Sequence, residues 1–187
     1  MNEPAEVIDY KGLKILIYQD ENPVDPREWD NFGTMIAFHP RYDIGDKHDL
    51  TKESLLKLVK QTEVVSLPLY LLDHSGLRIS TGKFVSDSAG WDTSLIGFIY
   101  ATKERILDEF DGDVERAQAT LQAEVELYDD YLTGNVYGYT VMDGDHMVDS
   151  IWGYYGDPKD SGLIDEAKSA IDDYLTKKQK YEEITNA

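Results

Sequence analysis

The sequence contains no cysteine, which excludes disulfide bonds, thiolate metal ligands and a cysteine nucleophile. It is also poor in basic residues, since 18 Lys and Arg stand against 37 Asp and Glu, for a formal net charge of −19. The amino-terminal segment lacks the basic and apolar regions of a signal peptide, and no apolar run approaches the roughly 20 residues needed to cross a bilayer. We therefore expect a cytoplasmic protein.

The surplus of negative charge is the strongest functional signal in the sequence. Acidity far beyond what solubility needs works against the compact state by self-repulsion, so we expect the molecule to use its field to bind a basic partner. The same charge argues against direct binding of nucleic acid or of an anionic membrane. Residues 1–102 carry a net charge of −6 and residues 103–187 a net charge of −13. The second half is therefore expected to hold most of the acidic function.

Composition and hydrophobic pattern predict a single domain over residues 1–187, since 41% of the residues are hydrophobic and 11% aromatic. Runs typical of strands stand at 7–10, 13–18, 33–38, 64–72, 77–80, 94–101, 136–142 and 147–155. Three of the connections have turn chemistry, namely Lys11-Gly12, residues 73–76 and residues 143–146.

Pro68 cannot donate a hydrogen bond to a strand ladder, so its strand should be an edge or carry a bulge. Gly138 and Gly153 stand among strand aromatics, which also indicates bulges or close backbone approach.

Helical spacing of apolar residues appears in four segments. Thr51 can cap a helix with an apolar stripe of Leu55, Leu56, Leu58 and Val59. Further helices are expected over 103–112, from an Asp113 cap to Gly134, and over about 162–183, whereas the polar stretch 41–49 should be an exposed loop. The order of elements predicts an α+β fold, a single domain with a mainly antiparallel sheet and about three to four helices.

Short segments rich in aromatic residues and glycine recur through most of the chain. They are residues 29–34 (WDNFGT), 39–42 (HPRY), 67–70 (LPLY), 73–76 (DHSG), 90–92 (GWD), 96–100 (IGFIY), 128–138 (YDDYLTGNVYG) and 148–153 (VDSIWG). In these segments the chain resembles a family of uncharacterised acidic phage and mobile-element proteins. The resemblance implies a phage-like origin and a bacterial host, and it implies no activity and no catalytic residue.

The predicted helices of residues 103–131 form the strongest candidate binding surface. Its candidate partner-binding residues are Glu104, Asp108, Glu109, Asp111, Asp113, Glu115, Glu126, Asp129 and Asp130. Glu124 belongs to the same acidic helical region. Helical positions four apart rise about 6 Å, comparable with the spacing of phosphates along a DNA strand, so such carboxylates can imitate a phosphate track. By analogy with DNA-mimic anti-defence proteins, we expect an inhibitor that blocks the basic DNA- or RNA-binding site of a host defence or transcription protein. A homodimer would lengthen the track.

Neutralising five of these carboxylates should weaken the binding. The five are Asp108, Asp111, Glu115, Glu126 and Asp129.

Several other interpretations stay open at this level. The acidic helices can simply be a solvated face, in a phage structural or regulatory protein whose acidity ensures solubility. His39, Asp43, Asp46 and His48 crowd one loop and are plausible metal ligands, which would suit a small metal- or carboxylate-dependent hydrolase. The aromatic residues can form a core or line a groove.

Residues 73–76 contain Asp, His and Ser in sequence, but adjacent side chains do not converge as a catalytic triad does, so a turn is expected. No dinucleotide fingerprint or P-loop occurs, and no cofactor is expected.

Overall fold

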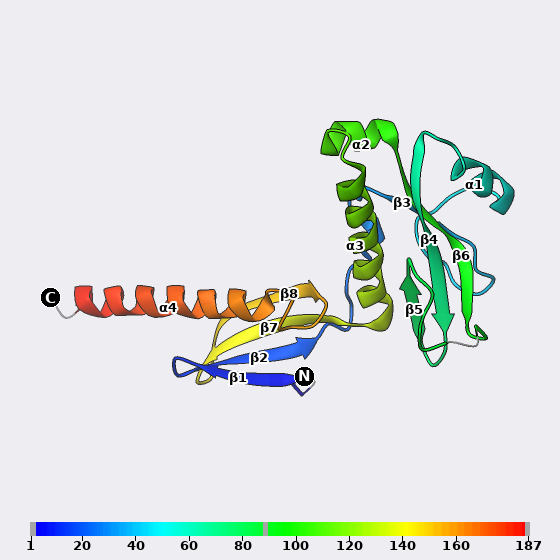
Figure 1. The fold of residues 1–187 in the computed structure, drawn as a ribbon. Coiled ribbons are helices and arrows are strands. Elements are labelled where there is room, and N and C mark those ends of the chain that lie inside the picture. Colours follow the sequence, from blue (N-terminus) through cyan, green and yellow to red (C-terminus); the bar gives the residue numbers. More distant parts are fainter. Residues whose placement is uncertain (1–2, 88–89, 186–187) are drawn as a thin grey trace. The chain divides into compact units, whose positions relative to one another are not determined.

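A computed structural model of the chain describes residues 3–87 and 90–185 (Figure 1). The described chain divides into two compact units. The terminal unit combines the residues up to Val24 with those from Gly134 onward, and the central unit spans Asp25–Thr133. The α+β class, the antiparallel pairing and the four α-helices are confirmed, and the strands form two four-stranded sheets. The boundary of one domain over 1–187 stays a prediction.

The terminal unit is an antiparallel sheet with one helix packed on one face. Its strands, in the order β1-β2-β7-β8, are β1 (Glu6–Tyr10), β2 (Leu13–Gln19), β7 (Val136–Asp143) and β8 (His146–Tyr155), and its helix is α4 (Leu163–Thr185). The helix buries Leu163, Ala167 and Ile171 against the sheet, which contributes Ile15 and Tyr139. Both predicted hairpin turns are confirmed. At the first of them Lys11 and Gly12 have φ values of 50° and 84°, as a two-residue hairpin turn requires.

Gly138 confirms the expectation of a bulge and of close approach. The register between β7 and β8 shifts between Tyr137 and Tyr139, and the Trp152 ring lies directly over the glycine. An added Cβ at Gly138 would stand 2.5 Å from the Trp152 ring. The missing side chain therefore lets Trp152 stack with Tyr18 across the middle strand, at 6.1 Å between ring centroids.

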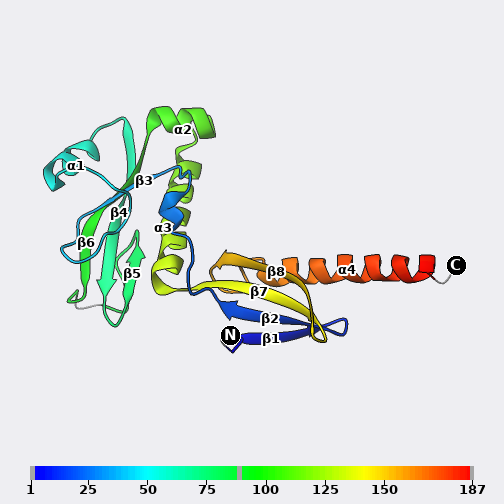
Figure 2. The ribbon, with the colours of Figure 1, turned by 180° about the vertical axis from the view of Figure 1, so that it is seen from behind.

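The central unit is a second antiparallel sheet, in the order β3-β6-β4-β5. Its strands are β3 (Thr34–Ala37), β4 (Val64–Asp73), β5 (Leu77–Ser80) and β6 (Thr93–Thr102), and its helices are η1 (Pro26–Glu28), α1 (Lys52–Leu58), α2 (Lys103–Phe110) and α3 (Val114–Thr133). The main core lies between the sheet and α3, which buries Ala117, Leu121, Val125 and Tyr128. Both views show α3 alongside this sheet, and α3 packs most closely near β5 (Figures 1 and 2).

The prediction for Pro68 is confirmed locally. Strand β4 lies between β6 and β5, but β5 pairs only with Tyr70 to Asp73, so β6 is the strand paired with Pro68. A register shift between β4 and β6 follows at Leu69 and Tyr70. The proline therefore stands next to a bulge, one of the positions to which a strand proline is confined.

Two sequence-based expectations need correction. Leu56 of the expected apolar stripe on α1 is 45% exposed, and the buried residue of that helix is Leu55. The loop 41–49 is not uniformly exposed, since Ile44 is buried in the core and Gly45 bridges to Ile36 of β3.

Within the described residues, none of the helices combines the length and apolar character that a bilayer crossing demands.

Candidate functional site

The negative charge is shared between the two units. The terminal unit holds 16 acidic and 7 basic residues, a net charge of −9, and the central unit holds 21 and 11, a net charge of −10. The contrast between the halves of the sequence disappears in the fold, because the acidic carboxyl-terminal segment joins the less acidic amino terminus in one unit. A partner attracted by charge therefore meets a negative surface on either unit.

Acidic side chains gather where α2 meets α3. We call this the elbow surface, and it consists of the exposed residues Glu104, Asp108, Asp111, Asp113 and Glu115. The backbone fixes two of them. Asp111 ends α2 in the left-handed conformation, and Asp113 accepts the Arg116 N–H at 3.0 Å as the cap of α3. The backbone positions of the elbow residues are thus set by the end of α2 and the start of α3.

The basic residues at the elbow have neighbours of their own. The Arg105 guanidinium donates to Glu109, one turn along α2, at 2.7 Å. The Arg116 guanidinium lies over the Phe110 ring, 5.1 Å from its centroid. Residues 103–116 hold six acidic residues, the five of the elbow surface and Glu109, against Lys103, Arg105 and Arg116, so the elbow keeps a net charge of −3.

Four predicted residues on α3 have different surroundings. The Asp129 carboxylate is only 14% exposed, receives two bonds from Arg78, at 2.8 Å from Nε and 2.7 Å from Nη2, and accepts the Ile79 N–H at 2.8 Å. The bonds to Asp129 raise the pKa of Arg78. Glu124, which the sequence placed on the same acidic face, is also turned inward, whereas Glu126 is exposed and accepts from Gln122. Asp130 is half-buried. Asp129 and Glu124 thus tie α3 to its own unit.

Replacing Asp129 with asparagine should destabilise the protein by about 2 kcal/mol, because it weakens a charge-assisted pair and a main-chain bond. The exposed Glu126→Gln on the same helix is the control and should change stability by less than about 0.5 kcal/mol. Urea unfolding of both variants makes the comparison. Equal stabilities would mean that the Arg78 contact contributes nothing.

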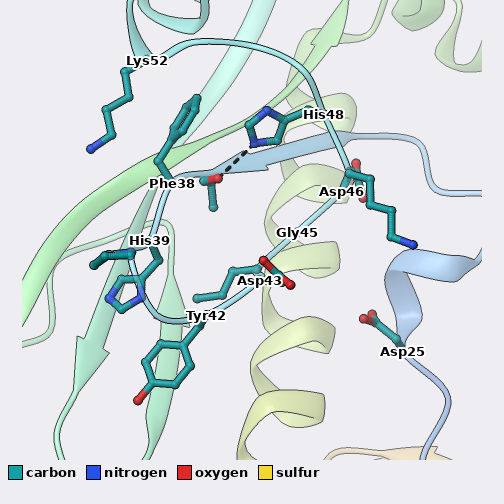
Figure 3. Close-up of a pocket in the computed structure, with 13 residues that line it drawn as sticks. Asp25, Phe38, His39, Tyr42, Asp43, Gly45, Asp46, His48 and Lys52 are labelled. Carbon is teal, nitrogen blue, oxygen red and sulfur yellow. Dashed lines mark hydrogen bonds between the residues drawn. The ribbon is translucent and has the colours of Figure 1, made fainter.

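The central unit also contains a pocket of about 760 Å³, which we call the loop pocket (Figure 3). Its lining comprises Asp25, Ala37, Phe38, His39, Pro40, Tyr42, Asp43, Ile44, Gly45, Asp46, Lys47, His48 and Lys52. Most of these residues belong to the loop between β3 and α1, which follows the apolar strand directly. All four candidate metal ligands from the sequence therefore line one pocket.

The pocket does not assemble those four side chains into a metal centre. Asp46 is bound to Arg27, and it also accepts the Met35 N–H at 2.8 Å. His48 donates through Nε2 to the Ala37 carbonyl at 3.1 Å, while His39 stacks on Tyr42. Among residues 3–87 and 90–185, no three His, Asp or Glu side chains are grouped so that they could hold a metal ion. The hydrolase interpretation therefore stays a prediction without a grouped ligand set among these residues.

A buried ionic network connects the loop between β3 and α1 to the rest of the central unit. The Arg27 side chain is 4% exposed and donates to Asp46 through Nε at 2.8 Å and Nη2 at 2.9 Å, and to Glu124 through Nη1 at 3.0 Å. Burial alone would lower the pKa of Arg27, but the bonds to Asp46 and Glu124 outweigh burial and raise it. Glu124 also accepts the Phe32 N–H at 2.7 Å. One guanidinium therefore joins the loop, the η1 segment and α3.

Sequence reasoning placed four residues in this pocket but missed others that build and line it. Arg27 follows a proline in a polar stretch and carries no pattern that distinguishes it from a surface arginine. Glu124 did have a signal, because it stands between the buried positions Leu121 and Val125 and one turn before Tyr128. From the sequence, Lys47 was expected only as part of the exposed loop 41–49, and Lys52 only as a solvent-facing residue of the helix that Thr51 caps.

Comparisons of the chain with protein-family models, with curated proteins and with solved structures found no match in any of the three. The similarity to phage proteins, and what it implies, therefore stays a prediction.

Proposed function

We propose that this protein is an acidic inhibitor of phage-like origin that binds the nucleic-acid-binding surface of a basic host protein through the elbow surface. The observation that carries the proposal is the set of five exposed acidic residues on α2 and the start of α3, in a molecule whose two units are both strongly negative. Such an array offers Lys and Arg side chains the same charge-assisted bonds that phosphates offer.

Electrostatics sets how this binding would behave. Glu104 and Asp108 stand one turn apart on α2, a rise of about 6 Å, which suits two cations that normally bind successive phosphates. Long-range attraction between opposite charges accelerates encounter and is screened over about 10 Å at 0.1 M salt. Binding should therefore weaken steeply as the salt concentration rises.

Two variants with equal net charge test the role of the elbow. The elbow variant carries four substitutions on the elbow surface, Glu104→Gln, Asp108→Asn, Asp111→Asn and Glu115→Gln, together with Glu126→Gln farther along α3. Asp113 is kept because it caps α3. Asp129, one of the five carboxylates chosen from the sequence, is left out because neutralising it would disturb its contact with Arg78. The control variant neutralises five exposed acids of the terminal unit, as Asp9→Asn, Asp160→Asn, Asp173→Asn, Glu182→Gln and Glu183→Gln. Both variants have a formal net charge of −14, five less negative than the parent chain.

The measurement is capture of proteins from a bacterial lysate at about 50 mM and about 500 mM salt, compared among parent and variants. We expect the parent and the control variant to retain the same basic protein at low salt and to release it at high salt, and the elbow variant to retain at least about tenfold less, the change produced by about 1.4 kcal/mol. Equal retention by all three chains would refute the proposal. So would recovery of no basic protein, which would favour acidity that serves solubility alone.

A further inference from the structure

The loop pocket has a chemistry that the proposed function does not use. Its loop is fixed before any ligand arrives, since Arg27 anchors Asp46 and Gly45 donates its N–H to the Tyr128 hydroxyl at 3.1 Å. Gly45 has a φ of +79°, and an added Cβ there would stand 2.6 Å from the Met35 carbonyl oxygen. A volume of about 760 Å³ also lies within the range of small-molecule sites. The cavity is therefore a preformed feature of the central unit.

Planar side chains line the cavity. The rings of His39 and Tyr42 are stacked, with centroids 4.9 Å apart and planes within 15°. The rings of Phe38 and His48 meet edge to face, also at 4.9 Å. Figure 3 shows Phe38, His39 and Tyr42 along one side of the loop. Such a group of rings is suited to a flat, unsaturated ligand, which gains stacking energy on any of them.

The cavity lining carries little net charge. It contains Lys47 and Lys52 against Asp25, Asp43 and Asp46, a net charge of −1, and the Arg27 that binds Asp46 also pairs with Glu124. The Lys52 ammonium lies 5.9 Å from the centroid of the Phe38 ring, so a positive charge and an aromatic surface stand together. Asp25 and Asp43 line another part of the cavity (Figure 3). An anionic group is thus accommodated beside Lys52, and donor groups beside the carboxylates.

From these features we infer that the loop pocket binds a nucleoside monophosphate or a closely similar planar anion. The base would stack on the ring cluster, the phosphate would pair with Lys52, and amino or hydroxyl groups would donate to Asp25 or Asp43. This inference does not depend on the elbow surface or on its basic partner, so either can fail alone.

The test uses AMP, GMP, CMP and UMP as probes, with the four nucleosides and inorganic phosphate as separate arms. Binding is followed through amide shifts of the isotopically labelled full chain. We expect at least one nucleotide to shift amides of residues 38–48, and to bind at least about tenfold more tightly than its nucleoside or phosphate, as a charged contact plus stacking requires.

Three variants separate the contributions. Lys52→Ala should weaken nucleotide binding about tenfold and leave nucleoside binding unchanged, because it removes one charged contact. Tyr42→Leu should weaken both. Lys57→Ala is the control, since this exposed lysine lies on the same helix, pairs with Glu53 at 2.8 Å and is outside the lining. Its binding should equal that of the parent.

Four results would overturn the inference. The first is the absence of amide shifts with all four nucleotides at about 10 mM, well above the millimolar range of weak sites, and the second is shifts confined to residues outside the pocket. The others are inorganic phosphate that binds as tightly as the nucleotides, and equal losses of nucleotide affinity in Lys52→Ala and Lys57→Ala.

Discussion

Replacing Arg27 with methionine is expected to destabilise the protein by about 3–5 kcal/mol, the cost of breaking a buried ion pair from one side. Methionine fills part of the same volume, so the loss comes mainly from the charges. The substitution leaves Glu124 and Asp46, which are 12% and 24% exposed, without their cation. It also removes the donor to the Gly33 carbonyl, at 2.7 Å. Urea unfolding followed by far-ultraviolet circular dichroism measures the effect.

Two controls identify the cause of that loss. Lys57→Met breaks an exposed ion pair with Glu53 and should cost less than about 1 kcal/mol. The triple variant Arg27→Met, Asp46→Asn and Glu124→Gln should be more stable than Arg27→Met alone, because it removes the unpaired charges and keeps oxygens that accept the main-chain N–H groups. A triple variant less stable than the single one would contradict the electrostatic explanation.

Replacing Gly97 with alanine is expected to destabilise the protein by about 3 kcal/mol or to prevent folding of the central unit. Gly97 lies on β6, which pairs with β3 on one side and β4 on the other. An added Cβ would stand 1.9 Å from the Ile36 carbonyl oxygen and 2.8 Å from Ala37 Cα. Both are backbone atoms of β3, so no side chain can rotate away and the strand itself must shift.

Gly82→Ala is the matched control, because an added Cβ there meets no atom within 4 Å. It should change the free energy of unfolding by less than about 0.5 kcal/mol. Unfolding curves of the two variants at the same protein concentration give the comparison. Similar values for both would show that β3 moves aside readily.

Local structure could be predicted from the sequence because it depends on neighbouring residues. Thr51 and Asp113 cap helices as expected, and the Lys11-Gly12 turn joins the expected pair of strands. Each of these features is decided within a few residues by capping, turn chemistry or apolar spacing. The division into two units is different. It depends on the pairing of Leu16 with Thr140, and no short-range pattern reports a partner at that separation.

The candidate sites show the same contrast. Sequence reasoning located the acidic helices, but it treated their carboxylates as equivalent, whereas the fold turns Glu124 and Asp129 toward arginines of the same unit. It listed four residues of the loop pocket as plausible metal ligands because their types are those of ligands. The contacts of Asp46, His48 and His39 follow instead from Arg27 and from the ring contacts, which depend on packing.

The central claim is that fixed carboxylates at the elbow, and not net charge in general, recognise a cationic surface. Its most direct test is the salt dependence of the dissociation constant for the captured basic protein, measured with the elbow variant and with the control variant of equal charge. The account predicts a shallower dependence and weaker binding for the elbow variant, with the control close to the parent. Identical salt dependence and affinity for the two variants would contradict it.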